Sequence, residues 1–235
     1  MRLVGLMRDK SPIILALDTP DVTSAIAMIE STHESISVYK LGLEFFLAHG
    51  KPGVETIQRA FPEVDIFLDL KLHDIPNTVG GASSSVSDVK PRFLTVHAAG
   101  GFEMIQAAVS HLPSTSITAV TVLTSLNSQE LRKLGLPEDS TSLAITLAQR
   151  AVDAGATSIV CSPHEASVLR EALGNSVIII TPGVRPQGSA KDDQSRVMTP
   201  EEAMSQGANY VVIGRPITQA SDPGQAALRI RNSLA

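Results

Sequence analysis

Short apolar segments alternate with longer amphipathic segments along almost the whole chain. Eight apolar segments are rich in β-branched residues and have the length of buried strands. They lie at residues 12–18, 36–40, 64–72, 92–97, 117–123, 157–161, 176–181 and 209–214. Segments with helical spacing or helix-start residues separate them, at residues 22–30, 42–48, 53–61, 77–89, 102–111, 127–135, 142–154, 163–173, 200–207 and 223–234. This alternation predicts parallel strands covered by helices.

Eight strand–helix repeats within 235 residues predict a closed (β/α)8 barrel, the TIM-barrel architecture, in the α/β class. An open, doubly wound sheet is the alternative. The sequence has no linker, low-complexity segment or change in composition that would divide it. We therefore expect a single domain over residues 1–235.

Composition narrows the possible functions. Aromatic residues make up only 3% of the chain and the net charge is −5, which argues against a nucleic-acid platform and a general polyanion binder. The single cysteine, Cys161, excludes an internal disulfide framework. Residues 1–10 hold too short an apolar stretch for a signal peptide, and the chain has no apolar run of about 20 residues. These features predict a soluble, cytoplasmic protein without a membrane segment.

Charged side chains interrupt the third predicted strand. Asp69 and Lys71 lie inside this apolar segment, two residues apart and therefore on one face, and Asp74 follows its end. A satisfied ion pair in the core is one interpretation. However, other predicted strands also end in polar groups, namely Asp18, Lys40, His97, Thr124 and Gly214 with Arg215. The carboxyl ends of barrel strands meet at one rim, so we expect a functional charge array there.

A second candidate cluster lies late in the chain. Arg185, Gln187 and Gln194 follow the seventh predicted strand, and Gly214 and Arg215 end the eighth. Loops after these two strands often bind phosphate in such barrels, although polar loop residues can also be merely solvated. Glycine admits an anion close to the backbone and arginine clamps it.

Other motifs carry less information. The sequence has no zinc-type spacing of histidine, cysteine and acidic residues, and the glycine pair at residues 100–101 lacks the pattern of a dinucleotide loop. We expect His73 to be packed or solvated, His97 to support the rim, and Cys161 to be a buried apolar residue.

Five segments together resemble the orotidine 5'-phosphate decarboxylase family, most closely its bacterial branch. They read, in chain order, ALDTPD, YKLGLEFF, DLKLHDIPNT, TPGVRPQG and VIGRPI. The resemblance covers nearly the whole chain. It implies a homodimer of (β/α)8 barrels that converts orotidine 5'-monophosphate into UMP, the last step of de novo pyrimidine nucleotide synthesis, without a metal or organic cofactor.

The resemblance also implies residue roles. Lys40, Asp69, Lys71 and Asp74 match the alternating catalytic array of the family, in which Asp74, with Ile75 and Thr78 beside it, reaches the neighbouring subunit's site. Asp18 and Lys40 match the residues that hold the ribose, and Thr124 matches one near the pyrimidine edge. The phosphate set is matched by Arg185, Gln194, Gly214 and Arg215, with Gln187 as a further candidate. In the implied reaction, Lys71 opposes the charge of a C6 carbanion and then protonates it, while residues 183–196 close over the phosphate.

Three alternatives remain open at this point. Sugar-phosphate enzymes of the same superfamily, such as keto-gulonate phosphate decarboxylase and hexulose phosphate synthase, share the D-x-K-x-x-D core but use Mg²⁺, and they have a glutamate in place of Lys40. A Schiff-base aldolase would use a barrel lysine as nucleophile, which conflicts with a lysine held as an ammonium ion between carboxylates. A catalytically inactive nucleotide-binding barrel is the third.

Overall fold

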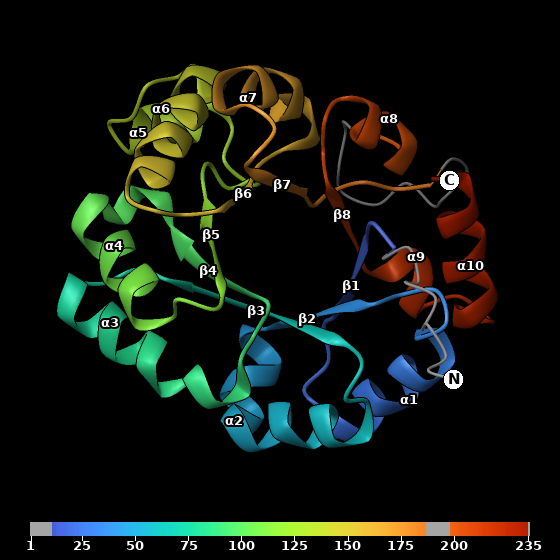
Figure 1. The fold of residues 1–235 in the computed structure, drawn as a ribbon. Helices are drawn as coiled ribbons and strands as arrows, with labels where there is room; N and C mark the ends of the chain where they lie inside the picture. The colour runs from blue at the N-terminus through green and yellow to red at the C-terminus, as the bar shows by residue number, and fades with distance from the viewer. Residues whose placement is uncertain (1–10, 187–197, 235) are drawn as a thin grey trace, which may run out of the picture.

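Eight parallel strands form one closed barrel in the computed structural model, which describes residues 11–186 and 198–234 (Figure 1). The strands are β1 (Ile13–Leu17), β2 (Val38–Gly42), β3 (Asp65–Leu72), β4 (Phe93–His97), β5 (Ser116–Val120), β6 (Ser158–Val160), β7 (Ile178–Thr181) and β8 (Tyr210–Ile213). Each strand pairs with the next in the sequence, and β8 pairs with β1. The predicted (β/α)8 barrel is confirmed, and closure excludes the open doubly wound sheet.

Helices surround this barrel as an outer ring (Figure 1). The α-helices are α1 (Val22–Thr32), α2 (Leu43–Ala60), α3 (Pro76–Ser85), α4 (Phe102–His111), α5 (Ser128–Lys133), α6 (Ser140–Asp153), α7 (Ala166–Leu173), α8 (Pro200–Ser205), α9 (Arg215–Thr218) and α10 (Pro223–Ser233). Short 3₁₀ turns lie at Ser87–Val89, Ala98–Gly100 and Pro163–Glu165. None of the helices in the described ranges is long and apolar enough to cross a membrane.

The strands are apolar because both of their faces are buried. One face packs against the helices, and the other fills the barrel interior with a cluster that includes Ile14, Val38, Phe67, Phe93 and Ile180. Side chains of a strand alternate between its faces, so the residue two positions later points into the barrel again. The interior cluster therefore forms the floor beneath the polar residues that follow at the carboxyl ends of the strands.

Local sequence explains where several helices begin and break. Thr199 caps α8: its side chain accepts a hydrogen bond from the Glu202 backbone N–H, and the Glu202 side chain accepts one from the Thr199 backbone N–H. The two helical segments predicted between residues 42 and 61 form α2, which is interrupted at Gly50. This residue has φ +55°, a left-handed conformation that glycine adopts without steric cost.

Three element boundaries differ from the prediction and affect the site. Strand β2 continues to Gly42, so Lys40 lies within the strand rather than at its end. Strand β5 ends at Val120, which leaves Thr124 in the following loop. Arg215 is the first residue of α9 instead of the last residue of a strand, because Pro216 favours a helix start.

Candidate active site

A cavity of about 360 Å³ opens at the carboxyl ends of the strands, next to a second cavity of about 870 Å³ that shares Thr124 with it. Eight of the predicted site residues line the first cavity: Asp18, Lys40, Asp69, Lys71, Thr124, Arg185, Gly214 and Arg215. Lys71 and Arg215 therefore line the same cavity. Their roles in it stay predictions.

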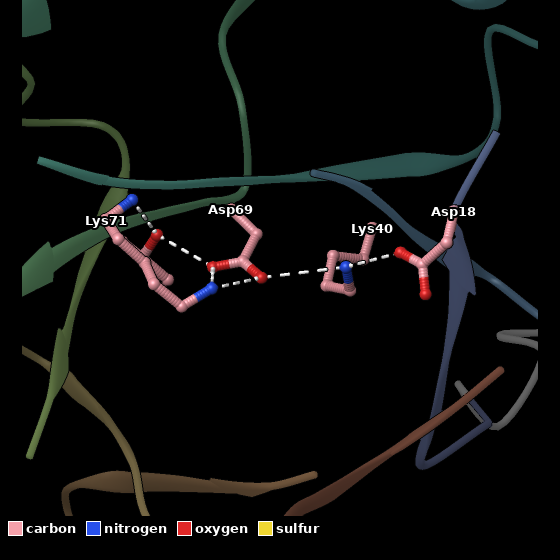
Figure 2. A network of polar contacts seen from close by, with 5 residues as sticks. Asp18, Lys40, Asp69 and Lys71 are labelled. Atoms are coloured by element: carbon pink, nitrogen blue, oxygen red, sulfur yellow. Dashed lines mark hydrogen bonds and ion pairs between the residues drawn. The ribbon is translucent and has the colours of Figure 1, made fainter. Parts of the chain in front are cut away.

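Four charged side chains form a continuous chain across the first three strands (Figure 2). The Lys71 ammonium lies 2.8 Å from both oxygens of Asp69. Lys40 lies 3.6 Å from the other side of the same carboxylate and 3.1 Å from Asp18. Positive and negative groups thus alternate in the order Asp18, Lys40, Asp69, Lys71. Such an array presents an ammonium group to the cavity while each carboxylate has a cationic partner.

Asp69 is the centre of this chain, with a side chain that is 14% exposed. Burial by itself raises the pKa of the Asp69 carboxyl. The charges of Lys40 and Lys71, and hydrogen bonds from Lys71 and Thr95, outweigh burial and hold that pKa below its ordinary value. Asp69 is therefore a fixed anion between two cations. Asp18, in contrast, is 67% exposed at the end of the chain and is accessible to a ligand's hydroxyl groups.

The backbone of Lys71 is unusual. Its φ of +47° lies in the left-handed region, which costs a non-glycine residue about 1 kcal/mol or more. The simple alternation from which we predicted that Asp69 and Lys71 share a face does not hold here, because the register of β3 against β4 shifts between Leu68 and Leu72. Both side chains nevertheless reach the cavity. Strain of this kind is typical of functional sites.

Sequence reasoning missed Thr95 and the apolar lining of the cavity. Thr95 is a fully buried residue of β4 that contacts both Asp69 and Lys71. The available signal was a hydroxyl residue inside the apolar segment at residues 92–97. The apolar lining includes Ala16, Phe67, Val120, Val160, Cys161 and Val212. This apolar part of the lining suits a flat, uncharged ring.

Three predicted residues lie away from the cavity. Asp74, Ile75 and Thr78 are exposed, and Ile75 is 66% exposed although it is apolar. The Asp74 carboxylate accepts a hydrogen bond from the Ile75 backbone N–H at 2.6 Å. The position of Asp74 at the end of β3, outside the lining of its own chain's cavity, leaves it available to a neighbouring molecule.

The structure describes three of the residues that are candidates for phosphate binding, Arg185, Gly214 and Arg215. Arg185 follows β7, and its backbone N–H bonds the Met198 carbonyl, which joins the two described ends of this loop. Gly214 precedes Arg215; a Cβ at Gly214 would lie 3.9 Å from the Asp18 carboxylate, so glycine keeps that part of the cavity open. Gln187 and Gln194 lie outside the described residues.

The two histidines near the rim lie side by side, with the ring centroids of His73 and His97 5.3 Å apart. Burial, followed by the charges of His73 and Lys71, lowers the pKa of His97. A neutral imidazole at this position is consistent with a supporting role rather than with anion binding. Within residues 11–186 and 198–234, no group of three or more histidine, cysteine, aspartate or glutamate side chains is arranged to hold a metal ion.

The pKa of Asp69 predicts how stability depends on pH. Because the folded-state pKa lies below the unfolded value, Asp69 contributes stability that is fully present above about pH 4 and is lost as the pH falls through the folded-state pKa. We expect the unfolding free energy of the wild type, minus that of Asp69→Asn, to be constant from pH 7 to 5 and to shrink below pH 4. Urea unfolding of both proteins at each pH measures this difference, since other carboxylates titrate in both. A difference that grows on acidification would contradict the assignment.

Comparison with known proteins agrees with this geometry. The model of a family described as "Orotidine 5'-phosphate decarboxylase / HUMPS family" matches residues 11–230. A Thermobifida fusca protein named orotidine 5'-phosphate decarboxylase is 50% identical over 224 residues, which cover 95% of this chain and 96% of that protein. One of the same name from Anaeromyxobacter sp. (strain K) is 45% identical over 229 residues, 97% of this chain and 100% of that protein.

A solved structure shows the same likeness in three dimensions. The crystal structure of orotidine 5'-phosphate decarboxylase from Lactobacillus acidophilus superimposes with a TM-score of 0.83 at 33% identity, over 96% of this chain and 99% of that one. Sequence and fold thus agree over almost the full length. The chain belongs to the orotidine 5'-phosphate decarboxylase / HUMPS family.

Proposed function

We propose that this protein is a carboxy-lyase that converts orotidine 5'-monophosphate into UMP, the last step of de novo pyrimidine nucleotide synthesis. One observation carries the proposal: the alternating chain from Asp18 to Lys71 shares a cavity with Arg215. The substrate has matching parts, because its carboxylated ring and its phosphate lie at opposite ends of a ribose. The curated relatives named as this decarboxylase support the same reaction.

The cavity offers a partner for each part of the substrate. Arg185, Arg215 and the bare backbone at Gly214 suit the phosphate, with Gln194 as a further candidate. Asp18 and Lys40, which bond each other, suit the ribose hydroxyls. The apolar lining suits the face of the pyrimidine, and Thr124 suits its polar edge.

Lys71 then carries the chemistry. The bond between C6 and the carboxyl carbon breaks, CO₂ leaves, and the electron pair stays on C6. The Lys71 ammonium opposes this negative charge and gives C6 its proton, which leaves a neutral amine. At about 4 Å and an effective dielectric constant of about 20, one such charge contributes roughly 4 kcal/mol. Because enzymes lower barriers by about 8–23 kcal/mol, positioning and phosphate binding must supply much of the remainder.

Asp69 fixes Lys71 for this step. Both of its oxygens lie 2.8 Å from the ammonium nitrogen, which holds that nitrogen before the substrate arrives. A preorganised charge needs no reorientation as the carbanion forms, so its full interaction is available in the transition state. Asp69 also adds negative charge beside the carboxylate that leaves, which destabilises the bound substrate relative to the product.

We further propose that the active form is a homodimer in which Asp74 and Thr78 enter the neighbouring site. Exposure of Asp74, Ile75 and Thr78 supports this arrangement, because a 66% exposed isoleucine gains from burial against a second subunit.

We also propose that each subunit is a single domain over residues 1–235. The closed sheet, whose strands lie between Ile13 and Ile213, supports this organisation.

The Mg²⁺-dependent sugar-phosphate enzymes are the second candidate function, since the family model includes that branch. Lys40 argues against them, because it occupies the place of their glutamate and instead bridges Asp18 and Asp69. The decisive experiment follows the loss of orotidylate absorbance with purified protein, with and without EDTA. Turnover that EDTA leaves unchanged supports the decarboxylase. Absence of turnover on orotidylate, or its abolition by EDTA, would overturn the proposal.

Mixing two inactive variants tests the shared site. Lys71→Ala disables its own site and Asp74→Asn disables the neighbouring one, so each homodimer is expected to be inactive. After subunit exchange, half of the dimers are mixed and each has one intact site, which predicts about a quarter of wild-type activity. If the mixture stays inactive while native mass spectrometry shows mixed dimers, Asp74 acts within its own subunit.

A further inference from the structure

Strand β3 contains a bulge at the catalytic array. Its pairing with β4 runs from Leu68 opposite Leu94 directly to Leu72 opposite Val96. Three residues of β3, from Asp69 to Lys71, therefore face the single residue Thr95. A bulge removes backbone groups from the regular ladder of hydrogen bonds, so another group must satisfy them.

The Thr95 hydroxyl fills this role. It lies 2.8 Å from the Lys71 backbone nitrogen and 3.0 Å from Asp69 Oδ1, and Thr95 is fully buried. The Lys71 amide N–H can only donate and the ionised Asp69 carboxylate can only accept, so the direction of both hydrogen bonds of the Thr95 hydroxyl is determined. The hydroxyl accepts from Lys71 and donates to Asp69. One side chain thus joins the backbone of the lysine to the carboxylate that holds its ammonium group.

We propose that Thr95 is a positioning residue for the decarboxylation: its hydroxyl holds the bulge of β3 and thereby sets the ammonium of Lys71 against Asp69 and the reacting carbon. The inference rests on the proposed function, because it concerns the same site. Thr95 acts through Lys71 and Asp69 and does not line the cavity itself.

The strained backbone of Lys71 needs the hydrogen bond from its N–H to the Thr95 hydroxyl. A lysine with φ +47° returns to an extended conformation unless surrounding contacts prevent it, and Thr95 provides the hydrogen bond to its N–H. Rotation of this backbone swings the side chain away from the cavity. Displacement of a reacting group by about 1 Å can reduce turnover about 100-fold, so loss of the hydroxyl is expected to act mainly on the chemical step.

The test compares Thr95→Val, which keeps the shape of the side chain but lacks the hydroxyl, with Thr95→Ser, which keeps the hydroxyl. Thr118→Val is a matched control, because Thr118 pairs with Thr95 in the sheet and is equally buried, but its hydroxyl bonds Ser158 instead of the array. We expect kcat on orotidylate to fall about 100-fold in Thr95→Val, while Thr95→Ser and Thr118→Val stay within about threefold of wild type. KM and the dissociation constant of UMP, measured by calorimetry, are expected to change little in all three.

A normal kcat in Thr95→Val would overturn the inference, as would an equal loss of UMP binding and turnover, or the same loss in Thr118→Val. If Thr95→Val does not fold, Thr95→Cys replaces it: its weaker thiol is expected to give turnover about tenfold below that of Thr95→Ser, and equal turnover would contradict the proposal. A crystal structure of the variant gives a readout independent of activity. In that structure, Lys71 is expected to leave its left-handed conformation, and an unchanged backbone at Lys71 would overturn the inference. Inactivity of the wild type on orotidylate would instead refute the proposed function. The structural readout at Lys71 stays valid in that case.

Discussion

Lys71→Ala is expected to reduce turnover of orotidylate by at least five orders of magnitude while the barrel remains folded. The substitution removes a charge that contributes roughly 4 kcal/mol, about 10³-fold, at the nascent carbanion. It also removes the proton donor, and general acid catalysis contributes about 10²–10⁴-fold. Asp69 keeps its contacts with Lys40 and Thr95 in this variant, so we expect the barrel to stay folded with a modest loss of stability.

Single-turnover measurements and thermal unfolding, made on the same preparation, separate loss of catalysis from loss of folding. Lys51→Ala is the matched control, since Lys51 pairs with Asp88 outside the cavity at 2.7 Å and should retain full activity. Turnover of Lys71→Ala within tenfold of wild type would refute the central role of this ammonium group.

Arg215→Ala is expected to lower kcat/KM for orotidylate by about 30- to 5,000-fold, because truncation of a charge-paired group in a binding site costs about 2–5 kcal/mol. Activity on orotidine, which lacks the phosphate, should change little. The substitution therefore removes most of the advantage of the phosphorylated substrate. The measurement is kcat/KM for both substrates in wild type and variant.

Arg59→Ala is the matched control, because Arg59 lies in the last turn of α2, where it bonds Thr56 away from the cavity. An equal fall of kcat/KM on both substrates would show that Arg215 maintains the structure of the site and does not bind the phosphate. The two experiments thus test different contributions: Lys71 acts at the reacting carbon, whereas Arg215 supplies binding energy from the far end of the substrate.

The amino-acid sequence alone determined the barrel and the charged residues that line its cavity. Alternating apolar strands and amphipathic helices are local patterns, and eight repeats leave few ways to bury them. Residues at the ends of parallel strands share a rim, which is why the positions of Lys40, Asp69 and Lys71 along the chain were enough to group them with Arg215.

Only the tertiary structure decided how these groups are held. The bulge of β3, the left-handed backbone of Lys71 and the bridge through Thr95 depend on the register between β3 and β4, which no single segment encodes. Likewise, the exposure of Asp74 follows from where β3 ends relative to its neighbours. Local periodicity specifies which faces are buried, but contacts between strands distant in sequence set the ångström-scale positions on which the proposed chemistry depends.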